Sequence, residues 1–105
     1  MRESIDKRWY FCATNHALRL YFRHPETELD AMSVSDALLW QSCDTVLAAY
    51  SERDREILCK VYNYRDMPMS KAVERTALDM HIDRIRIWTL VNRVSIAIAK
   101  KGRLI

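Results

Sequence analysis

Basic side chains recur along the last helical stretch of the chain, and they are the residues best suited to bind a charged ligand. Between Asp83 and Arg103 the only acidic residue is Asp83 itself. Arginine presents a planar fork of donors that fits phosphate oxygens and the paired acceptors of guanine, whereas lysine presents a point charge. The basic residues here are Arg84, Arg86, Arg93, Lys100, Lys101 and Arg103. This composition predicts an affinity for a phosphate-lined groove.

The same stretch has the periodicity of an amphipathic helix. Its apolar residues recur at spacings of three and four, which places them on one helical face. They are Ile87, Leu90, Val91, Val94 and Ile98, and Arg84, Trp88, Asn92 and Ser95 should face elsewhere. Asp83 is a good N-cap, Ile82 can pack on Ile87 as a hydrophobic staple, and Gly102 is a plausible stop.

Two helices are expected in the first half of the chain. The first should be capped by Ser4 and end at His24, because the residue before a proline is pushed out of helical geometry. A polar, acidic connection over 26–32 follows. Ser33, with an acid three residues later, forms a capping box for a second helix that ends near Tyr50. The residues expected to face inward are Ile5, Trp9, Cys12, Ala13, His16 and Leu20 on the first helix, with Tyr10, Ala17 and Tyr21 beside them, and Val34, Ala37, Leu38, Trp40, Cys43, Val46 and Leu47 on the second.

Two shorter helices are expected before the basic one. Ser51 with Asp54 forms another capping box, and the third helix must end before Pro68. Ser70 then caps a fourth helix, and His81 begins the turn into the fifth. The residues expected to face inward are Ile57, Leu58, Val61 and Tyr62 on the third helix and Val73, Ala77 and Met80 on the fourth.

Composition favours an all-α protein. One Gly and two Pro among 105 residues leave few of the tight turns that a β-sandwich or barrel requires. We therefore expect one domain, residues 1–105, built as a compact bundle of about five helices, in which residues 1–49 brace a C-terminal half formed by residues 50–105. Residues 1–50 carry five Lys or Arg against seven Asp or Glu, whereas residues 51–105 carry twelve against seven. A basic partner surface should therefore lie in the second half.

Other classes of protein find little support in the sequence. No apolar run approaches the roughly 20 residues that span a bilayer, and the N-terminus is charged where a signal peptide would be apolar, so we expect a cytoplasmic protein without a membrane partner. Cys12, Cys43 and Cys59 are odd in number and lie among apolar neighbours, which is typical of reduced core thiols. Cys12 and His16 are four residues apart, but a zinc site needs four converging ligands. We expect no metal, no cofactor and no enzymatic activity, because no catalytic motif stands out.

A short helix, a three-residue turn and a longer basic helix, preceded by one further helix, form a helix-turn-helix. In this order, residues 50–103 resemble the DNA-binding fourth region of bacterial sigma factors and its small phage and mobile-element relatives. Where that family opens with Leu-Pro/Ser-Glu-Arg-Glu-Arg-Glu-Val-Leu, this chain has Tyr50-Ser51-Glu52-Arg53-Asp54-Arg55-Glu56-Ile57-Leu58. Where the family has Ile-Ala, a later Leu, a Gly-Val-Ser turn and Arg-x-Arg-Val, this chain has Thr76-Ala77, Met80, His81-Ile82-Asp83 and Arg84-Ile85-Arg86-Ile87. The family's frequent Ala-x-Ala-Lys-Lys-Gly corresponds to residues 97–102.

The resemblance implies a DNA-binding transcriptional regulator of sigma-like type from a phage or mobile element. Its recognition helix, residues 83–100, would lie in the major groove of double-stranded DNA, and RNA polymerase or another host protein would be a possible partner. The residues implied in DNA contact are Arg84, Arg86 and Thr89 at base edges, Asn92 and Arg93 at bases or backbone, Ser70 and Lys71 at a phosphate, and Lys100, Lys101 and Arg103 as general attraction.

Two alternatives use the same fold. Ile85 and Trp88 are apolar where sigma factors place charged or polar groups, so the helix could instead serve a protein–protein interaction module, such as a phage-encoded, anti-CRISPR-like inhibitor of a host nucleic-acid enzyme. Its contacts would include Tyr10, Tyr21 and the acidic 26–30 segment, and aromatic residues of the first helix could also mediate a homodimer. The arginines could also form local pairs on a solvated face, for example Arg86 with Asp79 or Asp83.

Overall fold

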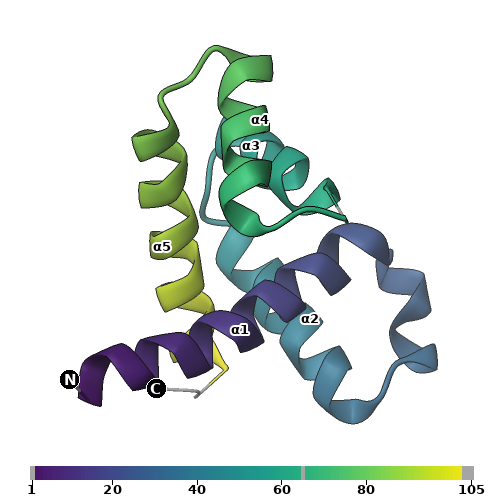
Figure 1. Ribbon diagram of the computed structural model, residues 1–105. Coiled ribbons are helices and arrows are strands. Elements are labelled where there is room, and N and C mark those ends of the chain that lie inside the picture. Colours follow the sequence, from purple (N-terminus) through teal and green to yellow (C-terminus); the bar gives the residue numbers. More distant parts are fainter. Residues whose placement is uncertain (1, 65, 103–105) are drawn as a thin grey trace.

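The chain folds into five α-helices and one short 3-10 helix within the part that the computed structural model describes. That part comprises the backbone of residues 2–64 and 66–102 and the side chains of residues 11–64 and 66–102. The elements are α1 (Arg2–Arg23), η1 (Glu26–Ala31), α2 (Val34–Leu47), α3 (Glu52–Asn63), α4 (Met69–Met80) and α5 (Arg84–Lys101) (Figure 1). The prediction of an all-α protein is confirmed, since these described residues include no strand. The side chains of Ile5, Trp9 and Tyr10, and all of Arg103, lie outside them.

The helices form two groups that share α5. In Figure 1, α1 crosses near the C-terminal end of α5, and α2 packs against both. At the other end of α5, α4 packs on α3 and on the first half of α5 (Figure 1). One apolar core runs through both groups and takes residues from all five α-helices.

Helix α5 is the axis of this core, and its predicted stripe is confirmed. All five predicted inward residues, from Ile87 to Ile98, are buried. Ser95 is buried as well, so the prediction that it faces elsewhere is wrong. Trp88 is half-buried and packs against the core. Both residues lie beside the stripe on the helix. Helix α5 contacts α1, α2 and α4, so the buried face of α5 is wider than the stripe alone.

Three of the predicted helix starts are confirmed by their caps. The hydroxyl of Ser33 accepts a hydrogen bond from the Asp36 amide at 3.1 Å, and Ser51 does the same for Asp54 at 3.1 Å. The Asp83 carboxylate accepts from the Ile85 amide at 2.9 Å. Each cap satisfies an amide that the first helical turn leaves without a partner.

Two other predicted starts are wrong. Helix α4 begins at Met69, with the extended Pro68 in the cap position, so Ser70 is the second helical residue. The Pro68 carbonyl already accepts the first bonds of the helix, from the amides of Lys71 and Ala72. Helix α1 begins at Arg2, before Ser4. Its end at Arg23 agrees with the prediction, because Pro25 cannot follow a helical residue.

The buried face of α1 differs from the predicted one. Thr14, Ala17 and Leu18 are buried, whereas Cys12 and His16 are exposed. Cys12 is therefore not a core thiol, whereas Cys43 is buried and Cys59 is half-buried. None of the three cysteines forms a disulfide bond with another. Helix α1 contacts α2, α3 and α5 together, and its rotation follows from these three partners.

Helix α2 is also rotated relative to the prediction. Val34 and Leu38, expected to face inward, are 79% and 59% exposed. The buried positions are Trp40, Cys43 and Leu47, which confirms these three predictions. The intervals of three and four between them place the three side chains on one face of the helix, away from Val34 and Leu38.

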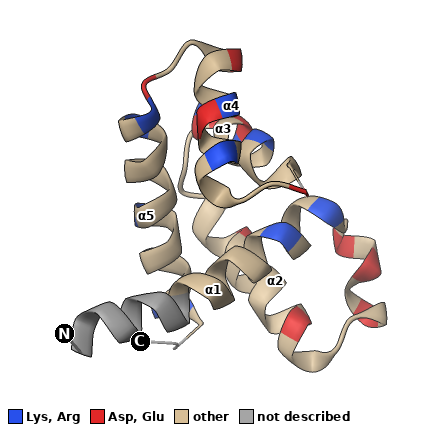
Figure 2. Cartoon of the chain, viewed as in Figure 1, with Lys and Arg blue, Asp and Glu red and all other residues tan. Residues whose placement is uncertain are grey.

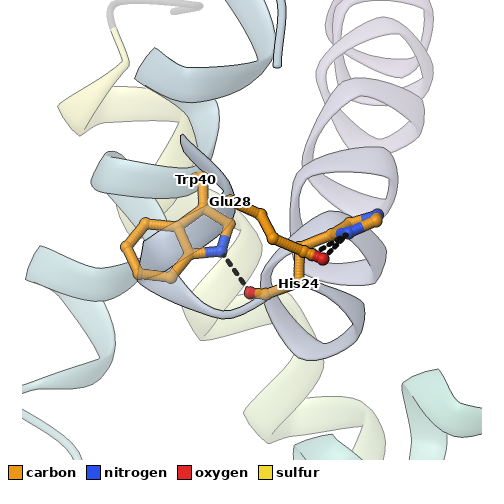
Figure 3. Close-up of polar contacts among 3 residues, drawn as sticks. All are labelled: His24, Glu28 and Trp40. Atoms are coloured by element: carbon orange, nitrogen blue, oxygen red, sulfur yellow. Dashed lines mark hydrogen bonds and ion pairs between the residues drawn. The ribbon is translucent and has the colours of Figure 1, made fainter. Parts of the chain in front are cut away.

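A polar junction holds the end of α1 to α2 (Figure 3). The indole N–H of Trp40 donates to the backbone carbonyl of His24 at 2.9 Å. The His24 imidazole contacts the Glu28 carboxylate at 3.2 Å, which ties η1 to the same point. The polar, acidic connection over 26–32 contains the 3-10 helix η1. A carbonyl at a helix end lacks an intrahelical partner, so the Trp40 indole supplies the hydrogen-bond donor that the His24 carbonyl would otherwise lack.

Two further hydrogen bonds position the C-terminal half. The Tyr62 hydroxyl donates to Asn15 Oδ1 at 2.6 Å and joins α3 to α1. The Tyr64 hydroxyl donates to Asp79 Oδ2 at 2.8 Å and joins the end of α3 to the end of α4. This second bond raises the pKa of Tyr64, because the neutral phenol is the form that donates.

The turn between α4 and α5 spans three residues and is left-handed at its start. His81 has φ 54° and ψ 47°, and it is the only non-glycine residue with positive φ in the described part of the chain. The Ile82 amide donates back to the Ala77 carbonyl at 3.0 Å, which closes the turn. A residue with a side chain adopts this conformation at some cost, so the packing on both sides must hold it.

Candidate nucleic-acid interface

One face of α5 is exposed in the described part of the chain. It lies opposite the buried stripe, and we call it the outer face of α5. Its residues are Ile85, Arg86, Thr89, Asn92, Arg93, Ile96 and Lys100, all of them exposed. Five of the residues predicted to contact DNA, namely Arg86, Thr89, Asn92, Arg93 and Lys100, are therefore brought together on one surface. Lys101 is exposed at the end of the same helix.

Arg84 lies on the side of α5 that faces α4. Its guanidinium is 3.7 Å from the Glu74 carboxylate, and Lys71 is also 3.7 Å from that carboxylate. These side chains are largely exposed, so each pair contributes little to stability. The pairs do lower the positive charge that Arg84 and Lys71 offer to a ligand. Local pairing of a predicted DNA contact thus occurs at Arg84, with Glu74 as its partner.

Arg86 and Arg93 are in a different situation. Among the described residues neither forms an ion pair. Both line a shallow cavity of about 350 Å³, together with Thr89, Leu90 and Asp54 of α3. Two guanidinium groups against one carboxylate leave this cavity with a net positive charge, which would attract an anion.

The start of α4 offers a second contact point for an anion. Ser70 and Lys71 are both exposed and lie in its first turn, which has no acidic residue. The Lys71 amide donates to Pro68, so the amides of Met69 and Ser70 are the ones that precede the first intrahelical bonds. A helix N-terminus of this kind favours a phosphate. Helix α4 packs against α5, so the two helices belong to the same part of the fold.

A cavity of about 650 Å³ lies along α4 and reaches the first residue of α5. We call it the α4 groove. It is lined by Met67, Lys71, Glu74, Arg75, Ala77, Leu78 and Arg84. Leu78 is 71% exposed within it, a residue that the sequence analysis did not single out. The apolar periodicity of α4 marks another side of the helix, so it gave no signal for Leu78.

The residues predicted for partner contact are dispersed. Ile85 is exposed on the outer face of α5, whereas Trp88 is half-buried against the core. Tyr21 is half-buried, its hydroxyl donates to Asp44 at 2.9 Å, and its ring packs 4.9 Å from that of Trp40. Burial raises the pKa of Tyr21 to about 12, and the bond to Asp44 adds to this shift. The Tyr10 side chain lies outside the described residues.

Acidic residues gather in η1. Figure 2 shows red along η1 and blue at the first turn of α5, with both colours on α4. In η1 the acidic residues of the first turn are Glu26 and Glu28. The acidic 26–30 segment therefore lies at the α1–α2 end of the fold, while the outer face of α5 belongs to the basic half (Figures 1 and 2).

Metal and membrane sites find no geometric support in the described part of the chain. No group of three or more His, Cys, Asp or Glu side chains there could hold a metal ion. His16, considered above with Cys12, instead contacts Asp36 at 3.2 Å. Among the described helices, none combines the length and the apolar character that crossing a membrane requires.

Comparisons with known proteins add no relative to this description. Neither a protein-family model, nor a curated protein, nor a solved structure matches the chain. The functional argument therefore depends on the residues and their geometry.

Proposed function

We propose that this chain is a DNA-binding transcriptional regulator of sigma-like helix-turn-helix type, encoded by a phage or mobile element. In this proposal α4, the turn at His81 and α5 form the helix-turn-helix, and α5 lies in the major groove of double-stranded DNA. The observation that carries the proposal is the outer face of α5, on which Arg86, Asn92, Arg93 and Lys100 are exposed together.

The dimensions of α5 suit this role. It has 18 residues and is therefore about 27 Å long. An α-helix with its side chains is about 10–12 Å wide, which matches the roughly 12 Å width of the major groove. Its N-terminal turn follows directly on the three-residue turn. In helix-turn-helix proteins this end of the recognition helix meets the base edges.

The residues take different parts in the proposal. Arg86 and Arg93 reach the groove because no described carboxylate pairs with them. Ser70 and Lys71, at the start of α4, hold a backbone phosphate and set the angle of α5. Lys100 and Lys101 add sequence-independent attraction at the far end of the helix. Arg84 contributes less than the resemblance implies, because Glu74 neutralises part of its charge.

The first test is fluorescence anisotropy with a labelled random-sequence duplex over a salt series from about 50 to 200 mM. We expect binding that weakens steeply with salt. Arg86→Ala and Arg93→Ala should each weaken binding and reduce the slope of log affinity against log salt by about 0.9 if the lost contact is a phosphate. Arg23→Ala, which removes an exposed arginine at the end of α1, is the matched control and should change neither quantity.

Two outcomes would contradict the proposal. One is the absence of binding at about 50 mM salt, where electrostatic attraction is strongest. The other is equal binding by Arg86→Ala, Arg93→Ala and Arg23→Ala, which would place the DNA contact elsewhere on the surface. RNA polymerase, the partner that the resemblance implies, is tested separately by titrating purified core enzyme against labelled protein.

A second candidate function is a protein–protein interaction module, such as an inhibitor of a host nucleic-acid enzyme. The α4 groove favours it, because the exposed Leu78 lines it together with the basic Lys71, Arg75 and Arg84. A partner with an apolar anchor and acidic flanks would suit such a surface. Leu78→Ser should abolish partner binding in this case and leave duplex binding intact. A homodimer is tested by sedimentation of the protein over a range of concentrations.

A further inference from the structure

The midline of the outer face of α5 is apolar at its N-terminal end. Ile85, the second residue of the helix, is 69% exposed. Thr89 follows four residues later, one helical turn along the same line. Further on, Ile96 is 38% exposed. Ile85 is thus the more exposed of the two isoleucines on this face.

Thr89 adds to the apolar character of the line. Its hydroxyl donates to the Ile85 carbonyl at 2.9 Å. A hydroxyl has one proton, so this bond leaves Thr89 with a methyl group and an acceptor oxygen but no donor for a ligand. The first two turns of the outer face therefore present aliphatic carbon at both Ile85 and Thr89.

Cations stand on both sides of this line. Arg84 and Arg86 are the neighbours of Ile85 in sequence, and each is turned by about 100° from it around the helix axis. Arg84 lies toward α4, while Arg86 lies toward α3, where it shares a cavity with Asp54. An apolar centre between two positive edges matches the major groove, in which base edges lie between two phosphate backbones.

The major groove offers one apolar group for such a centre. Among the four bases only thymine presents a methyl group there, at C5, and side chains with aliphatic carbon contact it. Ile85 does not line the α4 groove, so its exposure is not part of that cavity. The apolar line and the α4 groove are therefore separate features.

We infer that Ile85 and Thr89 read thymine C5-methyl groups in the DNA site, so that the site is selected by methyl contact as well as by arginine. This inference rests on the proposed function and names part of its specificity. Arg86 and Arg93 anchor the helix along its α3 side, and Ile96, about three helical turns beyond Ile85, lies past them.

The experiment begins with a duplex selected by the protein from a pool with about 20 random base pairs, a length that exceeds the reach of one recognition helix. Each thymine of that duplex is then replaced singly by deoxyuridine, which lacks only the C5-methyl group. Anisotropy measures the affinity for every duplex at one salt concentration. We expect a loss of about fourfold at one or two positions, the value that burial of one methyl group corresponds to, and no loss at the others.

Three variants assign the effect to residues. Ile85→Ala should bind the thymine and uracil duplexes equally at one position. Thr89→Ser keeps the hydroxyl and removes only the methyl group. This variant should bind the thymine and uracil duplexes equally at a neighbouring position. Leu38→Ala, at an exposed apolar residue of α2 away from this face, is the control and should keep the full discrimination. Circular dichroism checks that all three variants fold.

The outcomes separate the inference from the proposed function. If the protein selects a sequence but no thymine can be distinguished from uracil, the inference fails while DNA binding stands. The inference also fails if Ile85→Ala and Thr89→Ser keep the discrimination, or if the pool yields no preferred sequence. If no duplex binds even at about 50 mM salt, the proposed function fails and the inference with it.

Discussion

Replacement of Thr76 by valine should stabilise the protein. Thr76 lies in α4 and is completely buried, yet its hydroxyl has no hydrogen-bond partner among the described residues. A hydroxyl that is removed from water without a partner costs about 1–3 kcal/mol of folding free energy. Valine has nearly the same shape and a similar helix propensity, so Thr76→Val removes this cost and little else.

The expected gain is about 1–2 kcal/mol in the free energy of unfolding. For a chain of this size, about 1 kcal/mol corresponds to a rise of roughly 4–8 °C in Tm. Thr14→Val is the matched control, because Thr14 is also completely buried in a helix but donates to the Phe11 carbonyl at 3.1 Å. That variant loses a formed bond and should be neutral or less stable by up to about 1 kcal/mol.

The assay is urea denaturation followed by far-UV circular dichroism, with a thermal melt as a second measure. The reasoning is refuted if Thr76→Val has a lower denaturation midpoint than the parent protein, or if it behaves like Thr14→Val.

Three further predictions concern the links between helices and the charge of the interface. Tyr62→Phe should lower the free energy of unfolding by about 1 kcal/mol, because it removes the 2.6 Å bond to Asn15; an unchanged urea midpoint would contradict this. Burial raises the pKa of Cys43 from 9.0 and that of Tyr21 from 10.0, each to about 12, so the unfolded chain loses these protons first. Stability should therefore be full below about pH 9 and fall between about pH 9 and 12, and melts of a Cys43→Ala, Tyr21→Phe variant should show a shallower fall. Glu74→Gln should strengthen duplex binding and steepen its salt dependence by releasing two cations, with Tm nearly unchanged; weaker binding would show that the pairs position the cations.

The site was partly predictable because much of it depends on one helix. The stripe from Ile87 to Ile98 has a period that only one rotation of the helix can bury, and this places Arg86, Thr89 and Arg93 outside. The pairing of Arg84 with Glu74 was not predictable, because it depends on the angle between α4 and α5. The exposure of Leu78 beside that pair also depends on how α4 packs against its neighbours.

What the sequence by itself determined is local. Ser33, Ser51 and Asp83 cap their helices, and Pro25 ends the first one, because these effects need only residues a few positions apart. The scarcity of Gly and Pro likewise predicted the all-α class.

The tertiary structure decided which faces of α1 and α2 are buried. Both helices carry apolar residues on more than one side, so periodicity alone leaves their rotation open. Helix α2 buries Trp40, Cys43 and Leu47, and with this rotation Val34 and Leu38 face outward. Contacts of α1 with three other helices bury Thr14 and leave Cys12 exposed. Such contacts join residues far apart in the chain, and their geometry exists only once the helices have packed.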